Sequence, residues 1–352
     1  MANSTSVLIR GEGVAACCCA RLLERRGLPF HIAPGARPKA PAILLGERTQ
    51  KLIADVFEQP SLFEGLARIR KRIVVWGENA KAVAIPHEAI LTSDEALLAR
   101  LQPHAGLASE AARGDEEGWT IYTSRPLPPA VRELTFGTRM ADVCPVLLRE
   151  SAETGACWIE SLEAGWLFLM ADGERGWLVS VGGPAERAMA KSNLVAAQVS
   201  SLEPSMGSFP THPRIADPLC SDNWMACGTA ALGFDPLCGD GTGNATREAI
   251  LACAVASAAL EGKAEADTAL VHYRARLQAG FERHLEVSRE FYHSGGRGDW
   301  WREQVAALDR GIAWCRQERK TVTGFHYRLV GFSLEKIHSA APVPPTGTNT
   351  GE

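Results

Sequence analysis

The sequence predicts an α/β fold in which a Rossmann-like nucleotide-binding part is interleaved with a β-sheet part and followed by a C-terminal helical segment. Two glycine-rich turns are the main observations. The first, residues 11–16, follows an apolar strand and opens a helix, and the second, residues 235–244, precedes a long run of small apolar residues. Between the two turns, short apolar runs separated by turn residues predict a sheet.

Length and composition limit the class of protein. The chain of 352 residues is long enough for two layered units with a substantial core. A formal charge of -4 argues against nucleic acid as a partner. No apolar run reaches the length of a membrane span, and the N-terminal residues pass into a strand without a basic region and signal core. We therefore expect a cytoplasmic protein that has no membrane contact.

The ten cysteines do not form a metal-binding pattern. No two of them make a C-x-x-C pair, and Cys17, Cys18 and Cys19 are consecutive. Consecutive side chains of a helix point about 100° apart, so these three cannot ligate one tetrahedral metal. We predict buried thiols in a reducing compartment and no metal site.

The first turn belongs to a β-turn-α-β unit. Residues 6–10 read as a strand, a helix extends to about residue 26, and residues 28–33 read as a second strand. The G-x-G-x-x-A pattern offers tight glycines and a helix N-terminus to a pyrophosphate. An acid that binds the ribose is expected about 20 residues on. None occurs before Glu47, so Arg37 or Lys39 is the candidate for phosphate contact instead.

The second turn combines a fixed bend at Pro236 with three closely spaced glycines. We predict Asn244 as the N-cap of a helix over residues 245–260 that ends at Gly262. The free N–H groups and the positive dipole end of this helix suit a phosphate or a delocalised anion. An ordinary glycine-rich entry to a helix is the alternative interpretation.

The remaining elements follow from local periodicity and turn residues. A basic cluster at residues 68–72 fits either a solvated strand edge or a contact with an anion. Residues 165–171 and 176–181 give a strong hairpin signal. A glycine- and tryptophan-rich turn, residues 294–301, separates the last two helices. We predict helices over 44–57, 93–101, 191–201, 264–293 and 302–320, and strands within 68–76, 82–91, 119–124, 136–148, 156–160 and 222–226.

Three motifs in this order carry a resemblance to a known family. They are G-x-G-x-x-A from Gly11, W-x-A-x-G-x-A-A from Trp224, and D-P-x-x-G-x-G from Asp235 before a small-residue helix. The combination resembles the FAD-dependent monooxygenase and halogenase superfamily, which has a p-hydroxybenzoate-hydroxylase-like fold. Residues 281–304 are in addition similar to the C-terminal helix pair of flavoproteins that modify a tryptophan in quinone-cofactor amine dehydrogenases and amino-acid oxidases.

The resemblance implies a domain division and a cofactor site. Residues 1–75 and 216–265 would bind FAD, residues 76–215 would form the substrate domain with a returning FAD-side strand near 119–125, residues 266–338 would be helical, and residues 339–352 would be a disordered tail. The implied FAD contacts are Gly11, Gly13, Val14, Ala15, Ala16, Arg37, Thr229, Asp235, Pro236, Gly239, Gly241, Thr242, Gly243 and Asn244.

The sequence also departs from the family. Thr229 stands where the family has an acid that binds the ribityl chain, and the segment from Tyr122 to Arg125 lacks the usual glycine. The halogenases' G-W-x-W-x-I-P stretch is incomplete at residues 165–171. Lys71 and Lys81 are the only choices near the expected position of a halogenase lysine.

The implied function is FAD-dependent oxidation, with hydroxylation of an aromatic substrate as the leading hypothesis. The substrate would be a small aromatic molecule or a tryptophan of a precursor protein in quinone-cofactor maturation, and the reductant NAD(P)H or a separate reductase. A halogenase and a non-catalytic or weakly flavin-binding maturation protein are the alternatives. No catalytic group stands out; the candidates are Lys71, Tyr292, His293 and Arg297.

Overall fold

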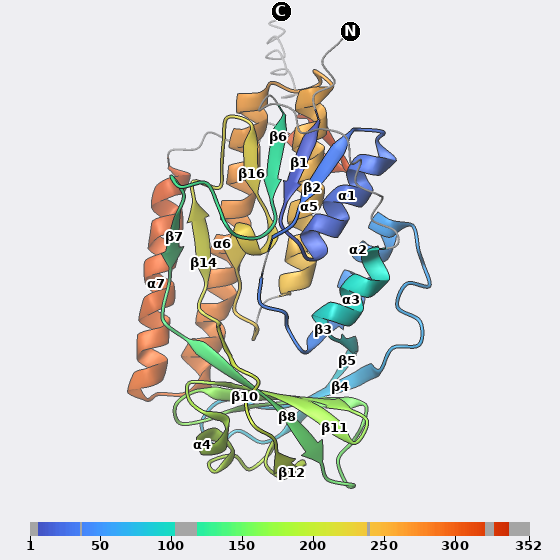
Figure 1. Cartoon of the computed structure of the whole chain (residues 1–352). Coiled ribbons are helices and arrows are strands. Elements are labelled where there is room, and N and C mark those ends of the chain that lie inside the picture. Colours follow the sequence, from blue (N-terminus) through green and yellow to red (C-terminus); the bar gives the residue numbers. More distant parts are fainter. Residues whose placement is uncertain (1–5, 36, 103–117, 238–239, 321–326, 338–352) are drawn as a thin grey trace, which may run out of the picture.

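A mostly parallel sheet forms one end of the protein. The computed structural model describes residues 6–35, 37–102, 118–237, 240–320 and 327–337 (Figure 1). The five strands follow the order β15-β16-β6-β1-β2, and all neighbours are parallel except β15 and β16. β6 therefore lies beside β1, at the place expected for the returning strand. The strands are β1 (Val7–Arg10), β2 (Phe30–Ala33), β6 (Trp119–Tyr122), β15 (Cys220–Ser221) and β16 (Trp224–Ala226).

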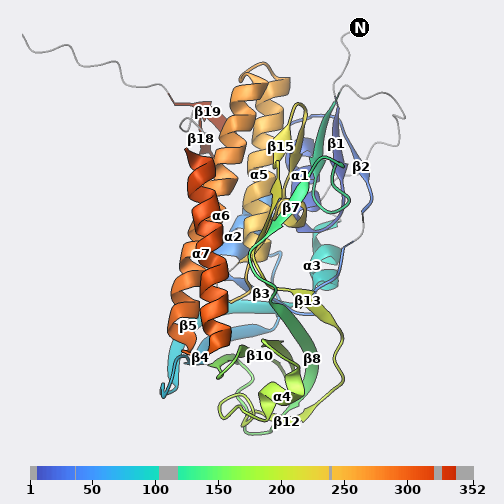
Figure 2. The ribbon, with the colours of Figure 1, turned by 90° about the vertical axis from the view of Figure 1, so that its left-hand side faces the viewer.

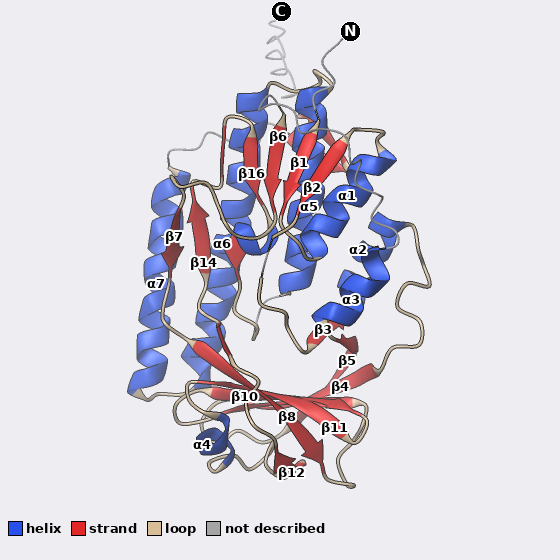
Figure 3. Ribbon diagram, viewed as in Figure 1, coloured by secondary structure: helices blue, strands red, loops and turns tan. Residues whose placement is uncertain are grey.

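A larger sheet lies at the opposite end of the molecule (Figure 3). Its order is β12-β8-β11-β10-β9-β4-β5-β3, with β13 also paired to β8, and only β4 and β9 are parallel. The predicted hairpin is confirmed as β10 and β11, in which Trp166 faces Val181. The strands are β3 (Ile43–Gly46), β4 (Arg68–Val75), β5 (Val83–Thr92), β8 (Met140–Leu148), β9 (Ala156–Ser161), β10 (Trp166–Asp172), β11 (Arg175–Val181), β12 (Val199–Leu202) and β13 (Ser208–Pro210).

The first 75 residues contribute strands to both large sheets, and a third, smaller sheet lies between them. β1 and β2 belong to the parallel sheet, whereas β3 and β4, which also lie within residues 1–75, belong to the larger sheet. A three-stranded sheet of order β17-β14-β7 runs between the two ends of the molecule (Figure 1). It consists of β7 (Arg132–Thr135), β14 (Arg214–Asp217) and β17 (Leu232–Gly233).

The three long helices α5, α6 and α7 lie side by side (Figure 2). α5 also packs on α1, where small side chains allow a close approach: the Cys253 thiol donates to the Cys19 carbonyl over 3.7 Å. The nine cysteines of the described ranges are all buried and free. The helices are α1 (Val14–Arg25), α2 (Glu47–Phe57), α3 (Asp94–Leu101), α4 (Ala185–Met189), α5 (Gly241–Leu260), α6 (Ala266–Gly295) and α7 (Asp299–Arg319), with a short 3-10 turn η2 (Gly228–Ala230).

Three predicted elements differ from the structure. The helix predicted over 44–57 begins only at Glu47, because the residues before it belong to β3. Residues 191–201 form turns that lead into β12, because the buried carboxylate of Glu160 accepts the N–H groups of Asn193, Leu194 and Val195 that a helix would use. The C-terminal segment is not helical throughout. A hairpin of β18 (Tyr327–Val330) and β19 (Ser333–Lys336) turns at Gly331, where φ is 58°.

The predicted start of α5 is also wrong. The helix begins at Gly241, three residues before Asn244, and Asp240 is the N-cap, whose carboxylate accepts the Gly243 N–H. Gly241 and Gly243 therefore belong to the first helical turn instead of a loop before it. The predicted disordered tail, residues 339–352, lies outside the described residues.

Two features are absent from the described ranges. None of the helices there combines the length and the apolar character that a bilayer crossing requires. In the same ranges, no three His, Cys, Asp or Glu side chains are grouped so that they could hold a metal ion.

Candidate functional site

The first glycine turn presents the uncapped N-terminus of α1. Gly11 and Gly13 have φ values of 123° and 100°, which other residues rarely adopt. Gly13 is the N-cap position, no side chain caps the helix, and its first turn contains no acid. Val14, Ala15 and Ala16 are buried in that turn. Free N–H groups and the positive dipole end therefore favour an anion at this place.

Arg37 lies directly over this turn. A Cβ added to Gly13 would lie 2.6 Å from its Nε. The guanidinium pairs with Asp94 at the N-terminus of α3, with Nη2 and Oδ1 2.5 Å apart and the carboxylate side chain only 3% exposed. Arg37, for which a phosphate contact is predicted, thus lies beside the first glycine turn, and the Asp94 carboxylate shares its charge.

Ser124 is a site residue that sequence reasoning missed. It follows β6, and a Cβ added to Gly11 or to Gly35 would lie 2.5 Å from its Oγ. The hydroxyl is buried and has no hydrogen-bond partner within the described part of the chain. A buried hydroxyl without a partner is costly, so it suits a ligand oxygen at the same glycines. Its position just after a strand that neighbours β1 was the available signal.

The η2 turn brings the two glycine-rich segments together. Gly228 has a φ of 59°, and a Cβ added there would lie 2.9 Å from the Ala15 Cβ and 3.7 Å from the Ala245 Cβ. The first turns of α1 and α5 therefore meet at one point. The hydroxyl of Thr229 donates to the Thr123 carbonyl over 3.2 Å, so this side chain bonds to the backbone that follows β6.

A buried acid supports the same turn from α5. Glu248 Oε2 accepts the Gly228 N–H over 2.7 Å. Burial raises the pKa of Glu248 to about 8, although the hydrogen bond from Gly228 and the charge of Arg214 act in the opposite direction. Glu248 is therefore predominantly protonated at neutral pH.

The start of the second segment is held by buried partners. Asp235 is fully buried. Its Oδ2 accepts from Arg139 over 3.0 Å and from the Tyr292 hydroxyl over 2.7 Å, and its Oδ1 accepts the Leu237 N–H over 2.9 Å. This carboxylate therefore accepts three hydrogen bonds from donors of the protein. Pro236 follows and is partly buried.

The N-terminus of α5 carries a carboxylate. Asp240 accepts the Gly243 N–H over 2.9 Å and also a hydrogen bond from the hydroxyl of Thr49 in α2. Asn244 accepts from Arg247 over 3.0 Å. Gly241 and Thr242 lie in the same first turn, whereas Gly239 lies outside the described residues. The positive dipole end that was expected to face an anionic ligand is thus already balanced by an acid.

The four catalytic candidates do not form one constellation. Lys71 is on β4 and pairs with Glu153. Tyr292 belongs to the buried Asp235 network, while His293 is exposed. The Arg297 side chain is 87% exposed, and its Nε lies 3.5 Å from Oε2 of Glu78.

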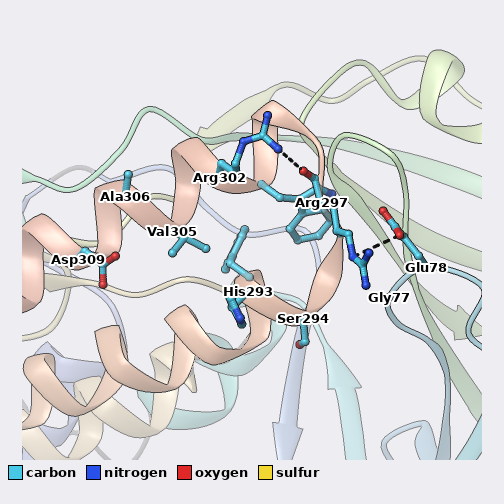
Figure 4. Close-up of a pocket in the computed structure, with 12 residues that line it drawn as sticks. Gly77, Glu78, His293, Ser294, Arg297, Arg302, Val305, Ala306 and Asp309 are labelled. Atoms are coloured by element: carbon cyan, nitrogen blue, oxygen red, sulfur yellow. Dashed lines mark hydrogen bonds and ion pairs between the residues drawn. The ribbon is translucent and has the colours of Figure 1, made fainter.

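Three of the candidates adjoin one cavity of ≈ 800 Å³ beside the α6–α7 turn. Tyr292, His293 and Arg297 contribute to its wall, together with Gly77, Glu78 and Trp301. In Figure 4 the Arg297 side chain extends toward Glu78, on the opposite side of the turn from Val305 and Ala306. Charged and apolar residues both line this cavity, and among its lining residues no nucleophile is paired with a base.

Comparison with known proteins identifies the fold. No protein-family model and no curated protein matches the sequence. The peptidyl tryptophan dihydroxylase QhpG, essential for tryptophylquinone cofactor biogenesis, is similar with a TM-score of 0.67 and 20% identity over 86% of this chain and 78% of that chain. The flavin-dependent halogenase CmlS is similar with a TM-score of 0.73 and 15% identity, over 96% of this chain and 84% of that chain. The p-nitrophenol 4-monooxygenase PnpA from Pseudomonas putida DLL-E4 is similar with a TM-score of 0.64 and 12% identity, over 90% of this chain and 96% of that chain.

These likenesses confirm the expected resemblance. The chain has the mixed α/β fold of FAD-dependent halogenases and monooxygenases. At such low identities they establish the fold, while the reaction must be argued from the site.

The residues at the α1 end fit the diphosphate of a dinucleotide. The helix N-terminus is uncapped, the unpartnered Ser124 hydroxyl adjoins Gly11, and Arg37 supplies a cation. The α5 end fits less well, because the Asp240 carboxylate occupies the helix N-terminus. The donor set thus supports binding of the cofactor and gives no support to charge stabilisation by α5.

Proposed function

We propose that the protein is an FAD-dependent oxidoreductase, and within that class a flavin monooxygenase that hydroxylates an electron-rich aromatic substrate. The observation that carries this proposal is the meeting of the first turns of α1 and α5 at Gly228, next to an uncapped helix N-terminus. Two turns that are more than 200 residues apart in the sequence thereby frame one site of the kind that binds a dinucleotide.

Each part of the site has a defined task. The N–H groups after Gly13 bind the diphosphate, the Ser124 hydroxyl donates to it, and Arg37 offsets its charge. Gly228 permits the close contact between the two helices. FAD, when bound, supplies the redox chemistry and oxygen activation, whereas the protein binds, orients and excludes water. A general base is not required at a fixed place, in agreement with the scattered candidates.

We propose two substrate classes, a small aromatic molecule or a tryptophan of a precursor protein. The similarity of residues 281–304 to the tryptophan-modifying flavoproteins, together with the fold shared with a peptidyl tryptophan dihydroxylase, supports the second class. The reductant would be NAD(P)H or a separate reductase. We place the protein in the cytoplasm, where its buried thiols remain reduced.

A direct experiment tests the proposal. The purified protein is examined for a flavin absorbance spectrum, and the released cofactor is identified by chromatography. We then expect the chemically reduced holoprotein to consume oxygen and to form a hydroxylated product from indole derivatives or tryptophan-containing peptides. A protein that neither retains nor binds FAD at micromolar concentration would contradict the proposal.

Two observations favour a second candidate, a maturation protein that binds flavin weakly or not at all. The charge of Arg37 is shared with Asp94, and Asp240 occupies the N-terminus of α5. Such a protein would bind a precursor chain without consuming oxygen. A halogenase has less support, because neither lysine candidate is a free amine in a buried site. Lys71 of β4 forms an ion pair with Glu153, and Lys81 is exposed.

A further inference from the structure

The carboxylate of Asp235 is the centre of a buried polar network. Its side chain is 0% exposed, and that of its ion-pair partner Arg139 is 1% exposed. A buried carboxylate needs several donors to offset its loss of hydration. Asp235 has three, from Arg139, from Tyr292 and from the N–H of Leu237, two residues further along the same loop.

The partners of Asp235 come from elements far apart in the sequence. Arg139 immediately precedes β8, donates from Nη1 to Gln304 of α7 over 3.0 Å, and lies with its guanidinium carbon 4.4 Å from the centre of the Tyr292 ring. Tyr292 is near the end of α6, and its hydroxyl accepts from Trp166 Nε1 of β10 over 3.1 Å. The network therefore joins both helices and the larger sheet to the loop.

A second tether reaches the loop from the same helix. His284 Nε2 accepts the backbone N–H of Asp235 over 2.9 Å. Burial lowers the pKa of His284 to about 4, so its ring is neutral and this nitrogen can accept. His284 and Tyr292 are eight residues apart, which places them on one face of α6. The helix thus holds both the backbone and the side chain of Asp235.

We propose that Tyr292, Arg139 and His284 are positioning residues for the flavin-binding loop that begins at Asp235. They act through Asp235 and do not touch the cofactor themselves. The α6–α7 pair thereby fixes the distance between the cofactor loop and the larger sheet. The inference rests on the proposed function, because it assumes that this loop faces FAD.

The test compares two tyrosines of α6. Tyr292→Phe removes the hydroxyl that joins Asp235 to Trp166. Tyr273→Phe is the matched control, since Tyr273 is also fully buried and donates one hydrogen bond, over 2.6 Å, to the carbonyl of Ala226. The apo forms are compared by thermal unfolding, and FAD binding is measured by titration of flavin fluorescence.

We expect both variants to be less stable, because each loses a buried hydrogen bond. Only Tyr292→Phe should raise the Kd for FAD, by about tenfold, and alter the absorbance bands of the bound flavin. A purely structural role would leave the spectrum of the bound flavin unchanged and would move the two Kd values together. Equal Kd values and identical spectra in the two variants would overturn the inference.

A second pair of variants covers the case in which Tyr292→Phe does not fold. His284→Gln keeps an acceptor for the Asp235 N–H, whereas His284→Leu removes it. We expect FAD affinity to be lost in the leucine variant and largely retained in the glutamine variant. The same affinity in both would contradict the role of His284.

The proposed function can fail separately. If the wild-type protein binds no FAD, the proposed function is refuted. The loop is then tested by hydrogen exchange, in which the Leu237 and Gly243 amides should exchange faster in Tyr292→Phe than in Tyr273→Phe. No difference in exchange would refute the positioning role as well. If wild type binds FAD and Tyr292→Phe behaves as the control does, only the positioning role falls.

Discussion

Arg37 and Asp94 form a largely buried ion pair directly over Gly13. The guanidinium is therefore shared between a protein carboxylate and the place where a diphosphate would bind. Removing either partner of a buried pair leaves a charge without compensation, which costs about 3 kcal/mol. Loss of Arg37 should therefore weaken both folding and cofactor binding, whereas loss of Asp94 should weaken folding alone.

We predict opposite effects on FAD affinity for the two partners. Arg37→Gln should raise the Kd for FAD about tenfold, because it removes a charge-assisted contact. Asp94→Asn should leave the Kd equal or lower it, because the guanidinium is no longer neutralised. Titration of the apo-protein with FAD measures both. The exposed pair Lys51–Asp55 is the control, and its loss should change stability by less than about 0.5 kcal/mol.

We predict that Gly228→Ala weakens both the fold and cofactor binding. The added Cβ would lie 2.9 Å from the Ala15 Cβ at a φ of 59°, so overpacking adds to backbone strain, together about 2–4 kcal/mol. Gly262→Ala is the matched control, because its φ is 67° and a Cβ there meets open space. It should cost about 1 kcal/mol and leave the Kd for FAD unchanged. Equal effects in denaturant unfolding would argue against the close contact.

Asp240→Asn should make the bound flavin easier to reduce. The substitution keeps an acceptor for the Gly243 N–H but removes a negative charge from the N-terminus of α5, which then favours the anionic reduced cofactor. We expect a more positive reduction potential in a dye-equilibration titration. Asp240→Ala also loses the cap and should cost about 1 kcal/mol of stability. An unchanged potential would indicate that the ring lies away from this helix end.

Glu248 should give the protein a specific dependence on pH. Its folded pKa, about 8, is above the ordinary value of 4.5. A raised folded pKa contributes stability that is complete below pH 4.5 and is lost as pH rises through about 8. The unfolding free energy of wild type relative to Glu248→Gln should therefore fall across this range. Denaturant unfolding of both proteins at about pH 5 and about pH 9 measures this difference in unfolding free energy. The same difference at both pH values would contradict the raised pKa of the buried Glu248 carboxyl group.

Much of the fold is encoded locally. The glycines of residues 11–13 predict a strand-to-helix turn because they alone tolerate positive φ, and the small apolar residues of 245–260 predict a tightly packed helix. The β10–β11 hairpin follows from two apolar runs on either side of a short turn. Residues 191–201 could not be predicted, because their N–H groups bond to Glu160 of another strand.

The residues along the chain are sufficient to predict two glycine turns that each open a helix, and a motif order that resembles that of FAD-dependent monooxygenases and halogenases. What those turns contact depends on long-range packing. The Ser124 hydroxyl, the Arg37–Asp94 pair and the bond between Tyr292 and Asp235 join segments that are 57 or more residues apart. Local propensity carries no information on such contacts, because burial and pairing of polar groups depend on how distant elements pack.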